Sequence, residues 1–270
     1  MISDITIGQY YKGDSLVHKL DARIKIVLTV LIILMIFCSK NFISLGVTIA
    51  FVLLSIAVSK VPFKMFFKSL KPIIPIVLFT TAINIFYVTG GTEYKIGFLT
   101  LTSKGILTAV FMAIRIVFLI MSSSILTYTT VPTMLTDAIE KLLSPLKIFK
   151  IQVHTLAMMM TLALRFIPTL IEEIERITNA QKARGADFES GNLIERIKAL
   201  IPILIPLFVS SFRRASELAF AMSCRCYTGG EGRTRMKQMK LTLKDFVSLG
   251  FFVFGFAGII FCNIYFGAII

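Results

Sequence analysis

Residues 179–188 read Asn-Ala-Gln-Lys-Ala-Arg-Gly-Ala-Asp-Phe, and they close a helix-like segment that begins near residue 152. The stretch places Arg184 between two small residues, Ala183 and Gly185, which together are called the first tip. Glycine readily takes the left-handed conformation that ends many helices, and an arginine in the last turn is favoured by the helix dipole. The guanidinium group can also form paired hydrogen bonds with a carboxylate. The stretch therefore predicts a helix that ends in a basic docking point.

A second ending of the same kind follows in the chain. Arg225 lies between Cys224 and Cys226, and these three residues are called the second tip. The helix-like segment before it covers residues 192–227, with Asn192 as a suitable N-cap and Glu195 as its capping-box partner. A single basic helix end is common and needs no function, but two in one chain favour a pair of docking points.

The composition of the chain is typical of a membrane protein. Of its 270 residues, 56% are hydrophobic and 16% are charged, and the mean hydropathy is +0.83. Soluble domains contain about 45–50% apolar and about 25% charged residues. The net charge of +14 does not indicate nucleic acid as a partner, because the basic residues lie between apolar runs rather than in one stripe with aromatics. The expected surroundings are a lipid bilayer.

The four cysteines do not predict a disulfide framework. Cys38 and Cys262 lie inside apolar runs, while the two cysteines of the second tip lie in a segment expected to face the reducing cytosol. No signal peptide is expected either, because the first 23 residues are mixed and polar, without an apolar core.

Five apolar runs predict transmembrane helices: residues 26–39, 41–59, 72–92, 105–130 and 246–270. The first is short, but Lys25 and Lys40 at its ends can extend their ammonium groups to the membrane surface. The fourth contains Arg115, which needs a partner because an unpaired charge inside a membrane is costly. The last contains three glycines suited to close helix packing, at positions 250, 255 and 258.

Residues 131–241, between the fourth and fifth runs, are more polar and hold 16 of the 29 basic residues. This region predicts one short amphipathic helix over residues 133–149 and two long helices over residues 152–183 and 192–227. The predicted fold is an all-α integral membrane protein with about five transmembrane helices and a cytoplasmic region of two long helices and one short helix inserted before the last span. Its domains would be residues 1–130, 131–241 and 242–270.

The basic residues also predict the orientation. Lys and Arg number four before the first span, then one, four and two in the following loops, and 17 before the last span. Because cytoplasmic loops are enriched in these residues, we expect a cytoplasmic N-terminus and an external C-terminus.

No catalytic, cofactor-binding or metal-binding residues are predicted. His18 and His154 are far apart, and the two thiols of the second tip lack the further ligands of a zinc site. The sequence has no G-x-x-x-x-G-K-[ST] loop, so any ATP would be handled by another chain. Met158, Met159 and Met160 fit an adaptable contact surface and core filling equally well.

Several motifs resemble those of a known family. They are Leu20-Asp21-Ala22-Arg23 and the stretches at residues 163–168 (Ala-Leu-Arg-Phe-Ile-Pro), 180–186 (Ala-Gln-Lys-Ala-Arg-Gly-Ala) and 230–235 (Gly-Glu-Gly-Arg-Thr-Arg). Over nearly its whole length the chain resembles the T components, the transmembrane coupling subunits, of energy-coupling factor transporters, a type of ABC transporter in prokaryotic cell membranes.

The resemblance implies a mechanism. The two long helices would be coupling helices whose tips dock into grooves of two cytosolic ATPase subunits. ATP binding and hydrolysis would move both tips, and the apolar helix faces would grip a small membrane-embedded substrate-binding S subunit in vitamin or micronutrient uptake. Residues 158–160 would be a possible S-subunit contact. Cys226 departs from the family pattern, which usually has glycine or serine after the arginine.

Other functions remain open at this stage. The chain could be a T component dedicated to cobalt or nickel uptake. An integral membrane enzyme is disfavoured because no G-x-S-x-G or H-E-x-x-H motif is present. A permease that carries substrate through its own spans is disfavoured because no internal repeat is visible.

Overall fold

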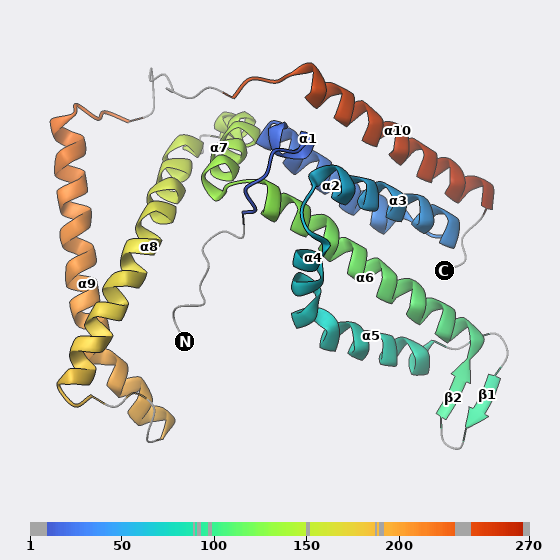
Figure 1. The fold of residues 1–270 in the computed structure, drawn as a ribbon, viewed down its shortest axis with the longest axis horizontal. Coiled ribbons are helices and arrows are strands. Elements are labelled where there is room, and N and C mark those ends of the chain that lie inside the picture. The colour runs from blue at the N-terminus through green and yellow to red at the C-terminus, as the bar shows by residue number, and fades with distance from the viewer. Residues whose placement is uncertain are drawn as a thin grey trace. The chain divides into compact units, whose positions relative to one another are not determined.

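The computed structural model describes residues 10–88, 90, 93–96, 99–149, 152–186, 188, 192–229 and 239–266 (Figure 1). In chain order the elements are α1 Leu16–Lys19, α2 Ala22–Cys38, α3 Phe42–Ser59, α4 Phe63–Leu70, η1 Lys71–Ile73, α5 Ile74–Tyr87, β1 Glu93–Ile96, β2 Leu99–Thr102, α6 Ser103–Thr129, α7 Pro132–Leu142, η2 Ser144–Phe149, α8 Val153–Ala183, α9 Leu193–Cys224 and α10 Leu243–Phe266. The chain divides into two compact units. The bundle unit comprises described residues 10–138 and 239–266, and the two-helix unit comprises described residues 139–229.

The bundle unit is built around α6, which packs against α2, α3, α4 and α5, while α10 packs against α2 and α3. These helices are apolar along most of their length, so the core is formed by side chains from all of them. The buried core residues are Leu28, Ile32, Met35, Ile36, Val52, Ile56, Val61, Phe66, Met121, Ile125, Tyr128, Phe252 and Ile259. Figure 1 shows α2, α3, α6 and α10 side by side.

Five described helices are long and apolar enough to cross a bilayer: Phe42–Ser59, Phe63–Tyr87, Ser103–Thr129, Val153–Ala183 and Leu243–Tyr265. The structure thus confirms an all-α membrane protein, although the set of helices differs from the predicted one. The set includes α8, which was expected outside the membrane and whose first half is apolar. It does not include α2, which at 17 residues is shorter than all five. A span needs roughly 17–25 residues, so α2 lies at the lower limit.

The predicted third span extends too far at its C-terminal end. Instead of one run over residues 72–92, the short helix α4 leads through the 3-10 turn η1 into α5, which ends at Tyr87. Val88 is extended, and Gly90 has a φ of 137°, a left-handed value that glycine accepts without strain. A β-hairpin follows, in which β1 and β2 pair antiparallel with Glu93 opposite Thr102. This hairpin was not predicted, although residues 93–96 (Glu-Tyr-Lys-Ile) and 99–102 (Leu-Thr-Leu-Thr) each alternate polar and apolar residues, as strands do.

The motif Leu20-Asp21-Ala22-Arg23 starts α2 and joins it to α10. The Asp21 carboxylate caps the helix by accepting from the Arg23 backbone N–H at 2.9 Å. The Asp21 backbone N–H donates to Asp245 Oδ1 at 2.9 Å, and Asp245 Oδ2 accepts from the backbone N–H and hydroxyl of Thr242 at 2.7 Å. Because Asp245 is only 1% exposed, this buried carboxylate fixes the beginnings of both helices.

One of the three glycines expected to allow close packing does so. A Cβ added at Gly255 of α10 would lie 2.4 Å from Cζ of Phe51 on α3, whereas one added at Gly250 or Gly258 would meet nothing within 4 Å. Glycine at position 255 therefore sets the close approach of α10 to α3.

Candidate functional site

The first tip ends α8 with a Schellman motif. Arg184 is the C-cap, Gly185 has a φ of 87°, and its backbone N–H donates to the Lys182 carbonyl at 3.0 Å. The Ala186 N–H donates to the Gln181 carbonyl, also at 3.0 Å. These two bonds satisfy carbonyls that a helix end leaves without partners. The ending matches the prediction from glycine at position 185.

The second tip ends α9 with the same motif, although it lacks glycine. Arg225 is the C-cap, and the Cys226 N–H donates to the Ser223 carbonyl at 3.0 Å. The Tyr227 N–H donates to the Met222 carbonyl at 3.1 Å. Cys226 has a φ of 53°, so it takes the left-handed position that glycine takes in the first tip. The two tips are therefore equivalent in backbone geometry.

Arg184 and Arg225 are both exposed, at the same position of equivalent helix ends. Among the described residues the ion pairs are those of Arg23, His154 and Arg214, so neither of these two guanidinium groups forms one. Each side chain can therefore offer a planar set of donors to a carboxylate on another protein.

The helices α8 and α9 pack antiparallel within the two-helix unit. Gln181 Nε2 donates to the Pro202 carbonyl at 3.4 Å, and Tyr227 Oη donates to Met158 Sδ at 3.0 Å. Between these contacts, Arg214 pairs with Glu173 at 2.6 Å. The two tips thus lie at opposite ends of the pair, roughly 35 Å apart for a rise of about 1.5 Å per residue.

Substituting the left-handed cysteine tests the equivalence of the tips. We expect Cys226→Gly to stabilise the last turn of α9 by about 1 kcal/mol, because a side chain in the left-handed region costs about that much. Hydrogen exchange of that turn should slow about fivefold, while ATPase assembly stays unchanged. Cys224→Gly, two residues earlier in helical conformation, is the control and should speed exchange. Faster exchange in Cys226→Gly would contradict the shared motif.

The sequence left open whether the three methionines form a contact surface or fill the core, and the structure shows some of each. Met158 is half-buried and accepts the hydrogen bond from Tyr227, so it packs against the second tip. Met159 and Met160 are 50% and 44% exposed, so they are available to a partner.

A larger apolar surface lies on α9, and its residues were not identified from the sequence. Its members recur at helical spacing and are called the α9 stripe: Ile197, Ile201, Leu204, Phe208 and Phe212. All are at least 45% exposed, and the rings of Phe208 and Phe212 stack with centroids 6.5 Å apart. Their spacing of four, three, four and four residues was the signal that could have revealed the stripe. An exposed apolar patch of this extent is typical of an interaction surface.

Arg115, whose partner could not be identified from the sequence, binds the C-terminal end of α2. Its Nη2 donates to the carbonyl of Ser39, the C-cap of α2, and its guanidinium lies 4.7 Å from the centroid of the Phe111 ring. Asn263 of α10 donates to the neighbouring carbonyl of Cys38 at 2.7 Å. The short helix α2 therefore has its last carbonyls satisfied by side chains from α6 and α10.

Replacing Arg115 tests this arrangement. We expect Arg115→Met to destabilise the bundle unit by about 1–3 kcal/mol, because the buried Ser39 carbonyl loses its donor. Thermal unfolding in detergent measures the change, with Lys104→Met, an exposed position on the same helix, as the control. Equal stability of the two variants would show that another group satisfies the carbonyl.

The histidines and acidic residues do not form a metal site in the described part of the chain, which contains no group of three potential ligands. His154 Nδ1 lies 3.1 Å from Glu140 Oε1, and His18 Nε2 lies 2.9 Å from the Tyr11 carbonyl.

Comparison with known proteins identifies the family. A family described as cobalt transport protein, CbiQ, matches residues 13–236. The energy-coupling factor transporter transmembrane protein EcfT of Clostridium kluyveri is 55% identical over 251 residues, which cover 92% of this chain and 93% of the relative. The chain belongs to the EcfT family. EcfT of Ruminiclostridium cellulolyticum is 54% identical over 93% of this chain and 94% of its own, and EcfT of Bacillus subtilis is 45% identical over 91% and 93%.

Membership in the EcfT family makes this chain the T component of an energy-coupling factor transporter. Five helices in the described part of the chain are suited to crossing a bilayer, so it is a multi-pass membrane protein. The relatives are named as transmembrane proteins of energy-coupling factor transporters.

Proposed function

We propose that this chain links ATP hydrolysis by two cytosolic ATPase subunits to the movement of a membrane-embedded substrate-binding S subunit. The observation that carries the proposal is the equivalence of the two tips, each a Schellman ending with an exposed arginine at the C-cap. Two equivalent docking points suit two similar partners. Each arginine would insert into an ATPase groove and bind a carboxylate there.

The packing of α8 and α9 supports transmission of motion between the tips. The pair is connected by the ion pair Arg214–Glu173 and by contacts near both ends. When the ATPase subunits approach each other or separate, a displacement at either tip would shift α8 and α9 against each other. The α9 stripe would move with the pair.

The α9 stripe is the surface we assign to the S subunit, together with the exposed residues Met159 and Met160. A membrane-embedded subunit has an apolar surface that matches the stripe. Methionine adapts its shape to different partners, which suits a surface that grips more than one S subunit. Met158 would contribute indirectly by holding Tyr227 next to the second tip.

The chain itself would be non-catalytic, with ATP bound and hydrolysed by the partner subunits. The lack of a phosphate-binding loop in the sequence supports this division of labour. The N-terminus and the region of residues 131–241 would face the cytoplasm, as the lysine and arginine distribution indicates. A reporter fused after residue 270 should read out as external.

The transported compound would be a vitamin or another micronutrient recognised by the S subunit. The description of the matching family as cobalt transport protein favours a second candidate, a T component dedicated to cobalt or nickel uptake. Isolating the assembled complex and identifying the S subunit with its bound ligand by mass spectrometry distinguishes the two.

Co-purification tests the proposed function as a whole. The full-length chain, affinity-tagged and extracted from native membranes, should retain two ATPase subunits and one small membrane protein in fixed ratio. Recovery of the chain without any ATPase, under conditions that preserve other ABC transporters, would refute the proposal.

A further inference from the structure

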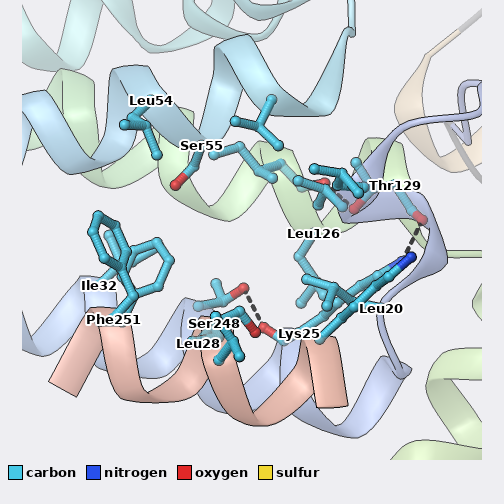
Figure 2. Close-up of a pocket in the computed structure, with 18 of the residues that line it drawn as sticks. Leu20, Lys25, Leu28, Ile32, Leu54, Ser55, Leu126, Thr129, Ser248 and Phe251 are labelled. Atoms are coloured by element: carbon cyan, nitrogen blue, oxygen red, sulfur yellow. Dashed lines mark hydrogen bonds between the residues drawn. The ribbon is translucent and has the colours of Figure 1, made fainter. Parts of the chain in front are cut away.

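A cavity of about 510 Å³ lies within the bundle unit, between α1, α2, α3, α6 and α10 (Figure 2). Its wall is almost wholly apolar and includes Leu28, Ile32, Leu54, Leu126 and Phe251. The volume falls in the range of about 300–1,000 Å³ that is usual for ligand sites. Because protein interiors are normally close-packed, apolar side chains around such a space lack contacts that a ligand could supply.

Two lysine side chains, Lys25 and Lys244, line the cavity, and the carboxylates of Asp21 and Asp245 lie close enough to Lys25 to interact with its charge. Lys25 is 6% exposed, and its ammonium donates to the carbonyls of Thr129 at 2.9 Å and His18 at 3.2 Å. Figure 2 shows Lys25 reaching Thr129. An ammonium has three donors, and these described contacts use two. Lys244 is exposed.

A buried hydroxyl without a partner lines the cavity further along α6. Ser122 is 1% exposed, and its Oγ has no hydrogen-bond partner among the described residues. It precedes Thr129, the residue that holds Lys25, by two helical turns, or roughly 10 Å along the axis. A buried hydroxyl left unpaired is costly, so this position favours a ligand with a hydrogen-bonding group at that depth.

We propose that this cavity binds one anionic phospholipid of the surrounding bilayer. The acyl chain fills the apolar part, the phosphate pairs with Lys25 and Lys244, and an ester carbonyl of the glycerol accepts from Ser122. A purely apolar molecule would leave the third donor of Lys25 and the hydroxyl of Ser122 unpaired. A phospholipid has an anionic head, then an ester group, then an apolar tail. This order matches the lysines, Ser122 and the apolar wall of the cavity.

Lipid retention in nanodiscs tests the proposal. The purified full-length chain is reconstituted into nanodiscs with equal amounts of phosphatidylglycerol and phosphatidylcholine, then released and weighed by native mass spectrometry. We expect one phosphatidylglycerol to be retained. Leu126→Trp, which fills the cavity, should reduce retention at least fivefold, whereas Leu107→Trp, 51% exposed on the same helix, should leave it unchanged.

A second pair of variants keeps the test valid if the tryptophan disturbs folding. Ser122→Ala should weaken retention a few-fold, while Ser123→Ala, its exposed neighbour, should not. Lys244→Gln should reduce the preference for phosphatidylglycerol. The proposal would be overturned if no lipid is bound or if both lipids are retained equally. It would also be overturned if the two tryptophan variants retain lipid equally, or if cross-linking shows a protein segment in the cavity. Because the readout is lipid bound to the chain alone, it does not depend on ATPase docking.

Discussion

Changing Arg184 and Arg225 together to alanine is expected to abolish assembly of the chain with its ATPase subunits and to stop transport. Each change removes a guanidinium that we expect to be buried against a carboxylate in the complex. Truncating one partner of such a pair costs about 2–5 kcal/mol, and about 1.4 kcal/mol corresponds to a tenfold change in affinity. The loss at each tip is therefore at least about thirtyfold. With both tips changed, no docking point remains.

Matched variants separate the position of the arginine from its charge. Arg213→Ala removes an exposed arginine from the middle of α9 and should leave assembly intact. The double change of Arg184 and Arg225 to lysine keeps both charges but loses the planar set of donors, so partial assembly is expected. The measurement for all three variants is the amount of ATPase that co-purifies with the tagged chain. Full assembly of the double alanine variant would contradict the docking role.

Phe208→Asp is expected to release the S subunit while leaving the ATPase subunits bound. Phe208 is 60% exposed, belongs to the α9 stripe and stacks on Phe212. A carboxylate there would be buried without a partner if the S subunit docked, at a cost of several kcal/mol. We expect transport to fall at least a hundredfold, because central aromatic residues dominate the binding energy of interfaces.

The control for this change adds the same charge elsewhere on the helix. Ser216→Asp lies two turns further along α9 on an exposed position outside the α9 stripe. It should retain both the S subunit and the ATPase subunits. The measurement is the ratio of S subunit to ATPase in the purified complex, together with substrate uptake in cells. An unchanged ratio in Phe208→Asp would show that the S subunit binds another surface.

Local chemistry made several helix ends predictable. Asn192 and Glu195 form the expected capping box at the start of α9, and Gly185 takes the expected left-handed position after α8. The end of α9 could not be derived in the same way, because a left-handed cysteine leaves no signature in the sequence. Only the backbone geometry of Cys226 shows that the second tip matches the first.

Contacts between distant parts of the chain were not predictable. Arg115 was recognised as a charge that needs a partner, but its partner is a backbone carbonyl at Ser39, which no sequence pattern identifies. The role of Asp245 at the start of α2 is hidden for the same reason. The helices long and apolar enough to cross a bilayer differ from the predicted spans at two places, because α2 lies at the short limit and half of α8 is as apolar as a span.

The cysteines of the second tip allow the central claim to be measured directly. Cys224 and Cys226 are exposed, whereas Cys38 and Cys262 are half-buried and can be replaced by serine. In inside-out vesicles, a membrane-impermeant maleimide should label the second tip quickly in the isolated chain and at least tenfold more slowly in the assembled transporter. In a variant whose reactive thiol is introduced by Ala183→Cys, labelling of the first tip should slow by a similar factor on assembly. Labelling at equal rates with and without the ATPase subunits, or labelling only from the external side, would contradict the account.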